Sequence, residues 1–190
     1  MEPFVWIDLE TTGLDPEAEQ VLEIGLIVTD QDYNPMDVFT SLVEPMHDAE
    51  TTRRFAVPFV REMHDKSGLW DQLGTVPPHT ARPAQVESKA IQWLERIMAE
   101  HEFTKPPLCG SSVGFDRGFL KVHMPTLEGY FHYRNIDVST IKELCRRRKP
   151  EVLEALPPKV ERHRSYPDLL DTINEMKHYD KYLFATEAVA

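Results

Sequence analysis

The stretch Phe4-Val5-Trp6-Ile7-Asp8-Leu9-Glu10-Thr11-Thr12-Gly13-Leu14 decides how the rest of the sequence is interpreted. Its first residues are apolar without alternation, which is typical of a central strand that is covered on both faces. The apolar run ends on Asp8 and Glu10, whose side chains point to the same face at about 7 Å or less. Two carboxylates at this spacing repel each other, which indicates raised pKa values or a bound hard cation such as Mg²⁺ or Mn²⁺. A simpler alternative is that the acids only end a strand where it meets a loop.

The size and charge of the chain limit the kind of protein it can be. Its 190 residues are enough for one compact domain, which we expect over residues 1–184, followed by a C-terminal tail at 185–190. The 32 acidic and 21 basic residues give a net charge of −11, and the sequence has no dominant basic stripe. Long nucleic acids need many Lys and Arg contacts, so any nucleotide ligand should be short.

The cysteines and apolar runs give no indication of export. Cys109 and Cys145 both lie in segments that look buried, which favours reduced thiols in the cytoplasm over a disulfide. The first residues lead directly into a strand without a charged leader, and no apolar run approaches the length of a membrane span. We therefore expect a cytoplasmic protein that is neither secreted nor membrane-bound.

Hydrophobic periodicity predicts an α/β fold. Residues 21–29 and 36–43 are strand-like and form, with the first strand, an antiparallel three-strand meander. Strands and helices alternate after it, so we expect a mixed five-stranded sheet with added parallel strands and helices on both sides. The remaining predicted elements are helical pieces within 50–74 that are broken at Pro58 and Gly68, an amphipathic helix at 84–103, a strand at 108–110, a helix through Phe115 and Leu120 that Ser111 and Ser112 can cap, a strand at 135–138 and a helix from Ser139.

The segment 161–168 brings a histidine close to another acid. Pro167 fits only the first turn of a helix, because deeper in the helix it would remove a hydrogen bond and clash. The helix should therefore begin near Ser165, which leaves His163 in the loop before it. From that loop the imidazole of His163 can fold over the face that Asp168 presents.

Three regions of the chain supply acids at structured positions, and the last region also supplies a histidine. Four carboxylates without a cysteine-histidine cluster suit a pair of oxygen-loving cations and argue against zinc. Two such ions can hold the attacking water and the leaving oxygen of a phosphodiester in line, and a nearby imidazole can take the proton from that water. For Asp116 alone, simple stabilisation by a helix dipole is an equal alternative. The candidate residues are Asp8, Glu10, Asp116, Asp168 and His163.

Four stretches of the chain resemble the successive motifs of a known family. They are DLETTGL at 8–14, GSSVGFDR at 110–117, YRNIDVSTIKEL at 133–144 and HRSYPD at 163–168. Together they resemble the oligoribonucleases, which are 3′-to-5′ exonucleases with four acids and a histidine on a ribonuclease H-like fold. The first motif is shared with proofreading DNA exonucleases, whereas the run at 133–144 is far more distinctive. The resemblance extends over about residues 4 to 184.

The resemblance implies an activity and a role for each candidate residue. The chain would act as a homodimer that hydrolyses short oligoribonucleotides from the 3′ end, especially 5′-phosphorylated dinucleotides such as pGpG, to nucleoside 5′-monophosphates. The resemblance implies that two Mg²⁺ or Mn²⁺ ions would be bound by Asp8, Glu10, Asp116 and Asp168, and that the general base would be His163. It implies that the bases would be wedged by Leu14 and Phe59, and that the 5′ phosphate would be capped by Ser112, Arg134, Ser139 and Thr140, with Asp137 in a supporting role. It also implies that the neighbouring protomer's site would be reached by His64 and Tyr133.

Four positions depart from the family pattern without removing a candidate metal ligand. They are Ser111 in place of the usual Asn, Ser165 in place of Ala, Phe59 in place of a common Trp, and Pro167 next to Asp168. Two other functions stay open. A DNA exonuclease would degrade long single-stranded DNA, which the negative charge argues against. A binding module without catalysis would not need the full set of acids and the histidine.

Overall fold

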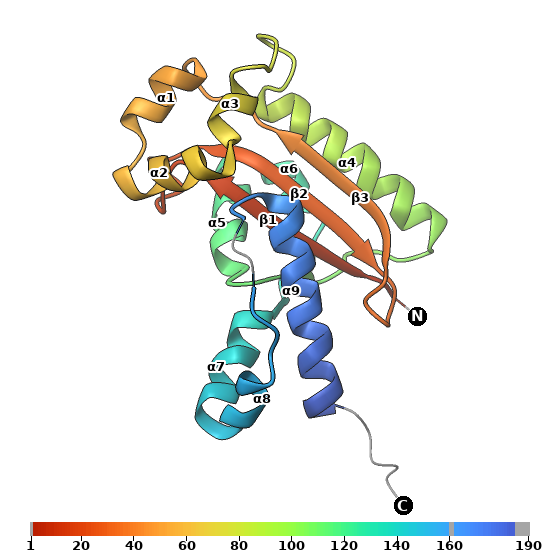
Figure 1. Ribbon diagram of the computed structural model, residues 1–190. Helices are drawn as coiled ribbons and strands as arrows, with labels where there is room; N and C mark the ends of the chain where they lie inside the picture. The colour runs from red at the N-terminus through yellow and green to blue at the C-terminus, as the bar shows by residue number, and fades with distance from the viewer. Residues whose placement is uncertain (1, 160–161, 185–190) are drawn as a thin grey trace, which may run out of the picture.

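The fold is built on one five-stranded sheet, in a computed structural model that describes residues 2–159 and 162–184. The strands β1, β2 and β3 form an antiparallel meander, whereas β4 runs parallel to β1 and β5 runs parallel to β4. The predicted α/β class and mixed sheet are therefore confirmed (Figure 1). In the spatial order of the sheet, the strands are β3 (Pro35–Leu42), β2 (Val21–Thr29), β1 (Phe4–Thr11), β4 (Leu108–Gly110) and β5 (Asn135–Asp137).

Helices occupy much of the remaining described chain. The first three follow the meander, and they are broken where the sequence predicts. Pro58 begins α2, and Gly68 ends it with a φ of 73°, a left-handed conformation that residues with a Cβ rarely adopt. The helices are α1 (Ala49–Phe55), α2 (Pro58–Ser67), α3 (Leu69–Leu73), α4 (Pro83–Glu100), α5 (Gly114–His123), α6 (Pro125–Glu128), α7 (Val138–Arg148), α8 (Pro150–Glu154) and α9 (Ser165–Tyr179), which continues into a π-helical turn at Asp180–Phe184.

Helices cover both faces of the sheet. On one face, Val5 and Ile7 of β1 share the largest apolar core with residues of α4 such as Leu94. On the other face, Trp6 packs with Ile27 of β2 and with apolar side chains of α9 and α7. α9 lies across β1 and β2, while α4 lies beside β3 (Figure 1). β1 is thus a central strand covered on both sides, as its apolar run predicts.

One local expectation is wrong. Ser111 and Ser112 do not cap α5, because Val113 precedes the helix and provides no side-chain cap. Ser112 instead has a φ of 57°, and its backbone N–H donates a 2.9 Å hydrogen bond to Asp137. The backbone of Ser112 is thus held by a residue far along the chain.

Other expectations can be compared directly with the described residues. Cys109 and Cys145 are both buried free thiols, so the expectation of no disulfide is confirmed. Within residues 2–159 and 162–184, no helix combines the length and apolar character needed to cross a membrane. The extent of a single domain over 1–184 stays a prediction, and the tail expected at 185–190 lies outside the described residues.

Candidate active site

The two acids at the end of β1 lie on the face of the sheet that α9 covers. Side chains alternate along a strand, so Asp8 and Glu10 share the face of Trp6, which packs against α9. In the antiparallel register, Asp8 lies opposite Gly25 and Glu10 lies opposite Glu23. The side chains of Asp8 and Glu10 therefore face the side chains of α9.

Gly25 explains how α9 can come so close to these acids. A Cβ at Gly25 would lie 2.9 Å from Ser165 Oγ and 3.0 Å from Leu169 Cδ1. No side chain larger than hydrogen fits between β2 and the start of α9 without a shift of one of them. The close approach places Asp168, in the first turn of α9, over the end of β1.

Asp168 completes a cluster of three carboxylates. One oxygen from each of Asp8, Glu10 and Asp168 lies within 4.8 Å of the other two. The prediction that the helix starts at Ser165, after His163, is confirmed, and a carboxylate in the first turn is favoured by the helix dipole. Several carboxylate oxygens around one point are the ligands that a hard divalent cation prefers.

The fourth predicted acid, Asp116 of α5, borders this cluster. Its buried carboxylate accepts a 2.9 Å hydrogen bond from the backbone N–H of Leu9, the residue between Asp8 and Glu10. Burial raises the pKa of Asp8 well above its usual range, and the charge of Asp116 is the next cause. Asp116 therefore lies close to Asp8, although it is not one of the three acids whose oxygens meet within 4.8 Å.

All four carboxyl groups titrate above their usual range. Burial raises the pKa of Glu10 to about 8, helped by the charges of Asp168 and Glu23. Burial also raises the pKa of Asp116 to about 7, and it raises the pKa of Asp168. Ionised carboxylates gathered away from water need a positive partner. The donor set therefore fits hard divalent cations such as Mg²⁺ or Mn²⁺.

His163 lies in the loop before α9 with an unusual backbone conformation. Its φ is 50°, in the left-handed region that few residues other than glycine adopt. The side chain is half-buried and lines a cavity of about 690 Å³ together with Asp8, Glu10 and Asp168. The structure thus brings the predicted base into the same space as three of the predicted metal ligands.

The rest of the cavity wall is largely apolar. Leu14 and Phe59 line it, although their side chains are 80% and 73% exposed. Val57, Met63 and Phe115 extend the apolar lining. A cavity with carboxylates at one place and large apolar side chains elsewhere suits a ligand with a polar reacting group and flat apolar parts.

A second polar group forms around Asp137, the residue that precedes α7. Its Oδ1 accepts hydrogen bonds from the backbone N–H of Ser112 at 2.9 Å, and from the N–H and hydroxyl of Ser139 at 2.9 and 2.7 Å. The charge of Asp137 also contributes to the raised pKa of Asp116, although burial is the larger cause. Two of the predicted phosphate ligands are thus brought together beside the carboxylates.

The other residues of the predicted phosphate cap lie on the surface. Arg134 places its guanidinium carbon 5.1 Å from the centroid of the Tyr133 ring, whose side chain is 74% exposed. Thr140 follows Ser139 in the first turn of α7 and is exposed. In the described part of the chain, the cavity that holds the carboxylates is lined neither by the four residues of the predicted phosphate cap nor by Tyr133.

The sequence matches known exonucleases over most of its length. The family model for exonucleases matches residues 5–176. The oligoribonuclease of Marinobacter nauticus is 40% identical over 180 residues, which cover 95% of this chain and 95% of the relative. The oligoribonuclease of Nitrosomonas europaea is 38% identical over 180 residues, covering 95% and 94%. The chain belongs to the oligoribonuclease family. It is therefore an enzyme, a 3′-to-5′ exoribonuclease.

Solved structures agree with the fold of this oligoribonuclease. A zinc-bound complex of E. coli exonuclease I with single-stranded DNA matches with a TM-score of 0.70 at 15% identity, over 97% of this chain and 42% of that protein. Exonuclease I from Methylocaldum szegediense matches with a TM-score of 0.66 at 16% identity, over 97% and 42%. The chain spans about two fifths of those proteins, so the likeness shows the fold alone.

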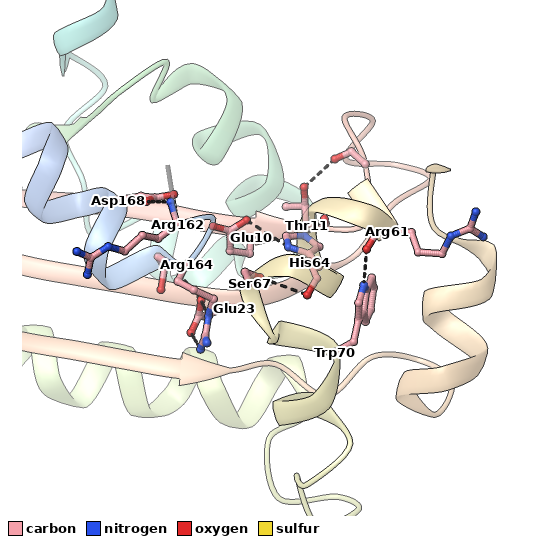
Figure 2. Close-up of polar contacts among 12 residues, drawn as sticks. Glu10, Thr11, Glu23, Arg61, His64, Ser67, Trp70, Arg162, Arg164 and Asp168 are labelled. Atoms are coloured by element: carbon pink, nitrogen blue, oxygen red, sulfur yellow. Dashed lines mark hydrogen bonds and ion pairs between the residues drawn. The ribbon is translucent and has the colours of Figure 1, made fainter. Parts of the chain in front are cut away.

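His64 of α2 has a different environment from the one that the oligoribonuclease resemblance implies. Its side chain is 0% exposed, and its Nε2 donates to the carbonyl oxygen of Thr11 at 3.0 Å. Its Nδ1 lies 3.8 Å from Oε2 of Glu10 (Figure 2). A side chain without exposed surface cannot extend into a neighbouring protomer, so that expectation is wrong. His64 instead supports the end of β1 within its own chain.

Glu23 and Arg164 flank the oligoribonuclease site and were not among the residues expected from the sequence. Arg164 donates to both oxygens of Glu23, at 3.0 Å from Nε and 2.7 Å from Nη2 (Figure 2). The sequence does single out Glu23, because it is the one charged residue in the apolar run of β2. A charge in a buried strand requires a partner, but the sequence does not say which cation provides it.

Proposed function

We propose that this chain hydrolyses short oligoribonucleotides from the 3′ end, favours 5′-phosphorylated dinucleotides such as pGpG, and releases nucleoside 5′-monophosphates. The observation that carries the proposal is the cluster of Asp8, Glu10 and Asp168 in one cavity with His163. Clustered carboxylates suit metal-assisted cleavage of a phosphodiester, and the apolar wall suits nucleobases. Membership of the oligoribonuclease family supports the same substrate class.

In this proposal, Asp8, Glu10, Asp116 and Asp168 hold two divalent ions, Mg²⁺ or Mn²⁺. When bound, such ions polarise the phosphodiester, lower the pKa of a water and stabilise the charge on the leaving oxygen. The chain presents its carboxylate oxygens in a fixed arrangement. The hydrogen bond from Leu9 N–H to Asp116 limits the rotation of that carboxylate, and the close packing of α9 on β2 limits the movement of Asp168.

His163 is the proposed general base. It lines the cavity beside the carboxylates, where it can take the proton from the attacking water. A positive charge on His163 lowers the pKa of Asp168, although burial dominates and raises it. The two side chains are therefore close enough for Asp168 to stabilise the imidazolium that proton transfer produces.

The preference for very short chains rests on the proposed substrate contacts. Leu14 and Phe59 are exposed at the cavity and can wedge against two bases. Ser112, Arg134, Ser139 and Thr140 are the proposed ligands of the 5′ phosphate, and the contacts of Ser112 and Ser139 with Asp137 bring those two near Asp116. A guanidinium with hydroxyl donors recognises a terminal phosphate strongly. The net charge of −11 disfavours longer polyanions.

The proposal includes a homodimer that works in the cytoplasm. Tyr133 is a large aromatic side chain left exposed beside Arg134, which suits contact with the site of a neighbouring protomer. Two free buried thiols agree with a reducing compartment. Light scattering tests the dimer, and a fully active monomer would contradict the role given to Tyr133.

A length series tests the proposed activity. Purified protein with Mn²⁺ is given RNA from dinucleotides to decanucleotides, each with and without a 5′ phosphate. We expect the fastest turnover for 5′-phosphorylated dinucleotides and slower turnover as the chain lengthens. Intact pGpG beside an active control enzyme would contradict the activity, and comparable turnover of long single-stranded DNA would contradict the substrate class.

A variant tests the role of the histidine. His163→Ala should lower turnover by about 10²- to 10⁴-fold and leave dinucleotide binding largely intact. The matched control is His101→Ala, an exposed histidine at the end of α4, which should keep the activity of the unchanged protein. A His163→Ala protein with normal turnover would show that another group takes the proton.

A further inference from the structure

The carboxylate of Glu23 binds the chain directly after His163. Arg164 donates to both oxygens of Glu23, at 3.0 and 2.7 Å, and the backbone N–H of Ser165 donates to it at 3.0 Å. Nη2 of Arg164 also donates to Oε1 of Gln72 on α3 at 2.7 Å. We call this set, Glu23, Arg164, Ser165 and Gln72, the Glu23 clamp. It joins β2, α3 and the start of α9.

The clamp lies where hydrogen bonds to charged groups are strong. Glu23 is 6% exposed, so water competes little for its oxygens. A two-pronged contact between a guanidinium and a carboxylate fixes the orientation of both groups. Glu23 also accepts a hydrogen bond from one of the free N–H groups in the first turn of α9, which is the positive end of the helix dipole. The N-cap residue, Arg164, provides no side-chain cap there.

The clamp also keeps Glu23 apart from the metal-binding acids. Glu23 lies directly opposite Glu10 in the sheet, and like charges at such positions repel. Both oxygens of Glu23 are already bound by Arg164. Glu23 is therefore placed to hold the loop rather than to act as a further metal ligand.

His163 is held between two anchors. On its C-terminal side is the Glu23 clamp, and on its N-terminal side the N–H of Arg162 donates to Oδ1 of Asp168 at 3.3 Å (Figure 2). The φ of 50° at His163 is a conformation that persists only where the surroundings impose it. The contacts that impose it are made by the residues on either side and by the first turn of α9.

We propose that Glu23 is a positioning residue for the hydrolytic reaction, acting through Arg164 and Ser165 to fix His163 and Asp168 in the productive geometry. The inference rests on the proposed function and deepens it. A displacement of about 1 Å in a reacting group can lower a rate by about 100-fold. The clamp touches neither Leu14 nor Phe59, so a loosened clamp should affect kcat far more than KM.

Conservative variants test this inference. Glu23→Gln keeps the shape of the carboxylate, and Arg164→Lys keeps the positive charge but loses the two-pronged contact. Glu23→Ala is avoided, because it would leave Arg164 near the core without its partner. The matched control is Arg96→Lys, which changes the same residue type in a 2.8 Å pair with Asp37 that joins α4 to β3 away from the site.

Each clamp variant should lower kcat by about tenfold or more on a 5′-phosphorylated dinucleotide, with KM changed by less than about threefold. Mn²⁺ affinity, measured by calorimetry, should fall by no more than about 10- to 100-fold, because the proposed metal ligands are all retained and only the position of Asp168 is loosened. The double variant Glu23→Gln/Arg164→Lys should have about the same kcat as the less active of the two single variants, because the two residues act as one unit. Arg96→Lys should keep the kcat of the unchanged protein.

Several results would overturn the inference. One is a folded Glu23→Gln protein with an unchanged kcat, and another is a clamp variant in which only KM rises. The inference would also fail if Arg96→Lys lost as much kcat as the clamp variants, or if the losses of kcat in the two single variants multiplied in the double variant. A measurement without turnover adds to these: the ¹⁵N signals of the His163 imidazole, assigned with His163→Gln, should shift in Arg164→Lys, and unchanged signals would contradict the clamp. An unchanged protein that leaves all RNA intact would overturn the proposed function, whereas an active protein with an equally active Glu23→Gln would overturn this inference alone.

Discussion

The backbone N–H of Leu9 donates a 2.9 Å hydrogen bond to the carboxylate of Asp116, which attaches α5 to β1 between the two acids of that strand. The bond holds Asp116 beside Asp8, although the charge of Asp116 is, after burial, the next cause of the raised pKa of Asp8. The fold therefore keeps like charges together at a cost in stability. Such a cost is common where a site is organised for a ligand.

Neutralising Asp116 should stabilise the metal-free protein and remove its activity. Asp116→Asn keeps an acceptor for Leu9 N–H but removes one of the repelling charges. We expect the free energy of unfolding at neutral pH to rise by about 1 kcal/mol, because a buried carboxyl with a raised pKa resists ionisation. Turnover should fall by about 100-fold or more. Urea denaturation in a chelator measures the first effect, with exposed Asp71→Asn as the control. A less stable Asp116→Asn would contradict the expected repulsion.

The metal-free protein should lose stability as the pH rises from about 7 to about 8.5. The pKa of Glu10 is raised to about 8 and that of Asp116 to about 7, in both cases chiefly by burial. A carboxyl whose pKa is higher in the folded chain binds extra protons there. Its stabilisation is complete below the unfolded pKa of about 4 and is lost as the pH rises through the folded pKa.

The expected loss is on the order of 1 kcal/mol and is measured by urea denaturation in a chelator. His64 does not interfere, because its lowered pKa affects stability only below about pH 6.5. Added Mn²⁺ should remove most of the dependence, since the cation takes the place of the protons. A free energy of unfolding that increases over this interval in chelator would show that the carboxylates do not repel as described.

An added methyl group at Gly25 should push α9 away from the sheet. The Cβ of Gly25→Ala would lie 2.9 Å from Ser165 Oγ, so we expect a loss of about 1–3 kcal/mol in stability and a drop in turnover as Asp168 moves. Gly118→Ala on α5 is the matched control, because its Cβ would lie 3.8 Å from Pro16 Cγ, an ordinary van der Waals contact. It should be neutral or stabilising by about 0.5–1 kcal/mol. Thermal unfolding and turnover of the two variants decide between these outcomes.

Arg134→Lys should weaken recognition of the 5′ phosphate. A guanidinium binds phosphate through two parallel hydrogen bonds, whereas an ammonium is a point charge. We expect KM for a 5′-phosphorylated dinucleotide to rise about tenfold, equivalent to about 1.4 kcal/mol, with little change for the same dinucleotide without the phosphate. Arg147→Lys, at an exposed position of α7, is the control. Equal weakening of both substrates would mean that Arg134 does not read the phosphate.

Local rules predict the elements that carry most of the site. β2 spans Val21–Thr29, the range predicted from its apolar run, because turn residues bound that run on both sides. The start of α9 at Ser165 follows from Pro167, which a helix accepts only in its first turn. Strand alternation puts Asp8 and Glu10 on one face, and the helix start puts Asp168 in the first turn of α9, whereas the packing of α9 on β1 and β2 brings the three together.

The contacts between distant segments could not be predicted in the same way. Ser112 does not cap α5, and its backbone N–H instead binds Asp137, much later in the chain. No local pattern in the sequence shows that the packing of α2 against the end of β1 buries His64 fully. The pairing of Glu23 with Arg164 joins residues 141 positions apart, and no local preference selects one arginine among the others.

The position of α9 late in the chain affects when activity can begin during synthesis. A growing polypeptide produces β1, β2 and α5 well before Asp168 and His163. Early segments can fold on the ribosome, but they lack one carboxylate and the imidazole. In the proposed mechanism, the growing chain therefore has no complete hydrolytic site until its last long helix, α9, docks on the sheet.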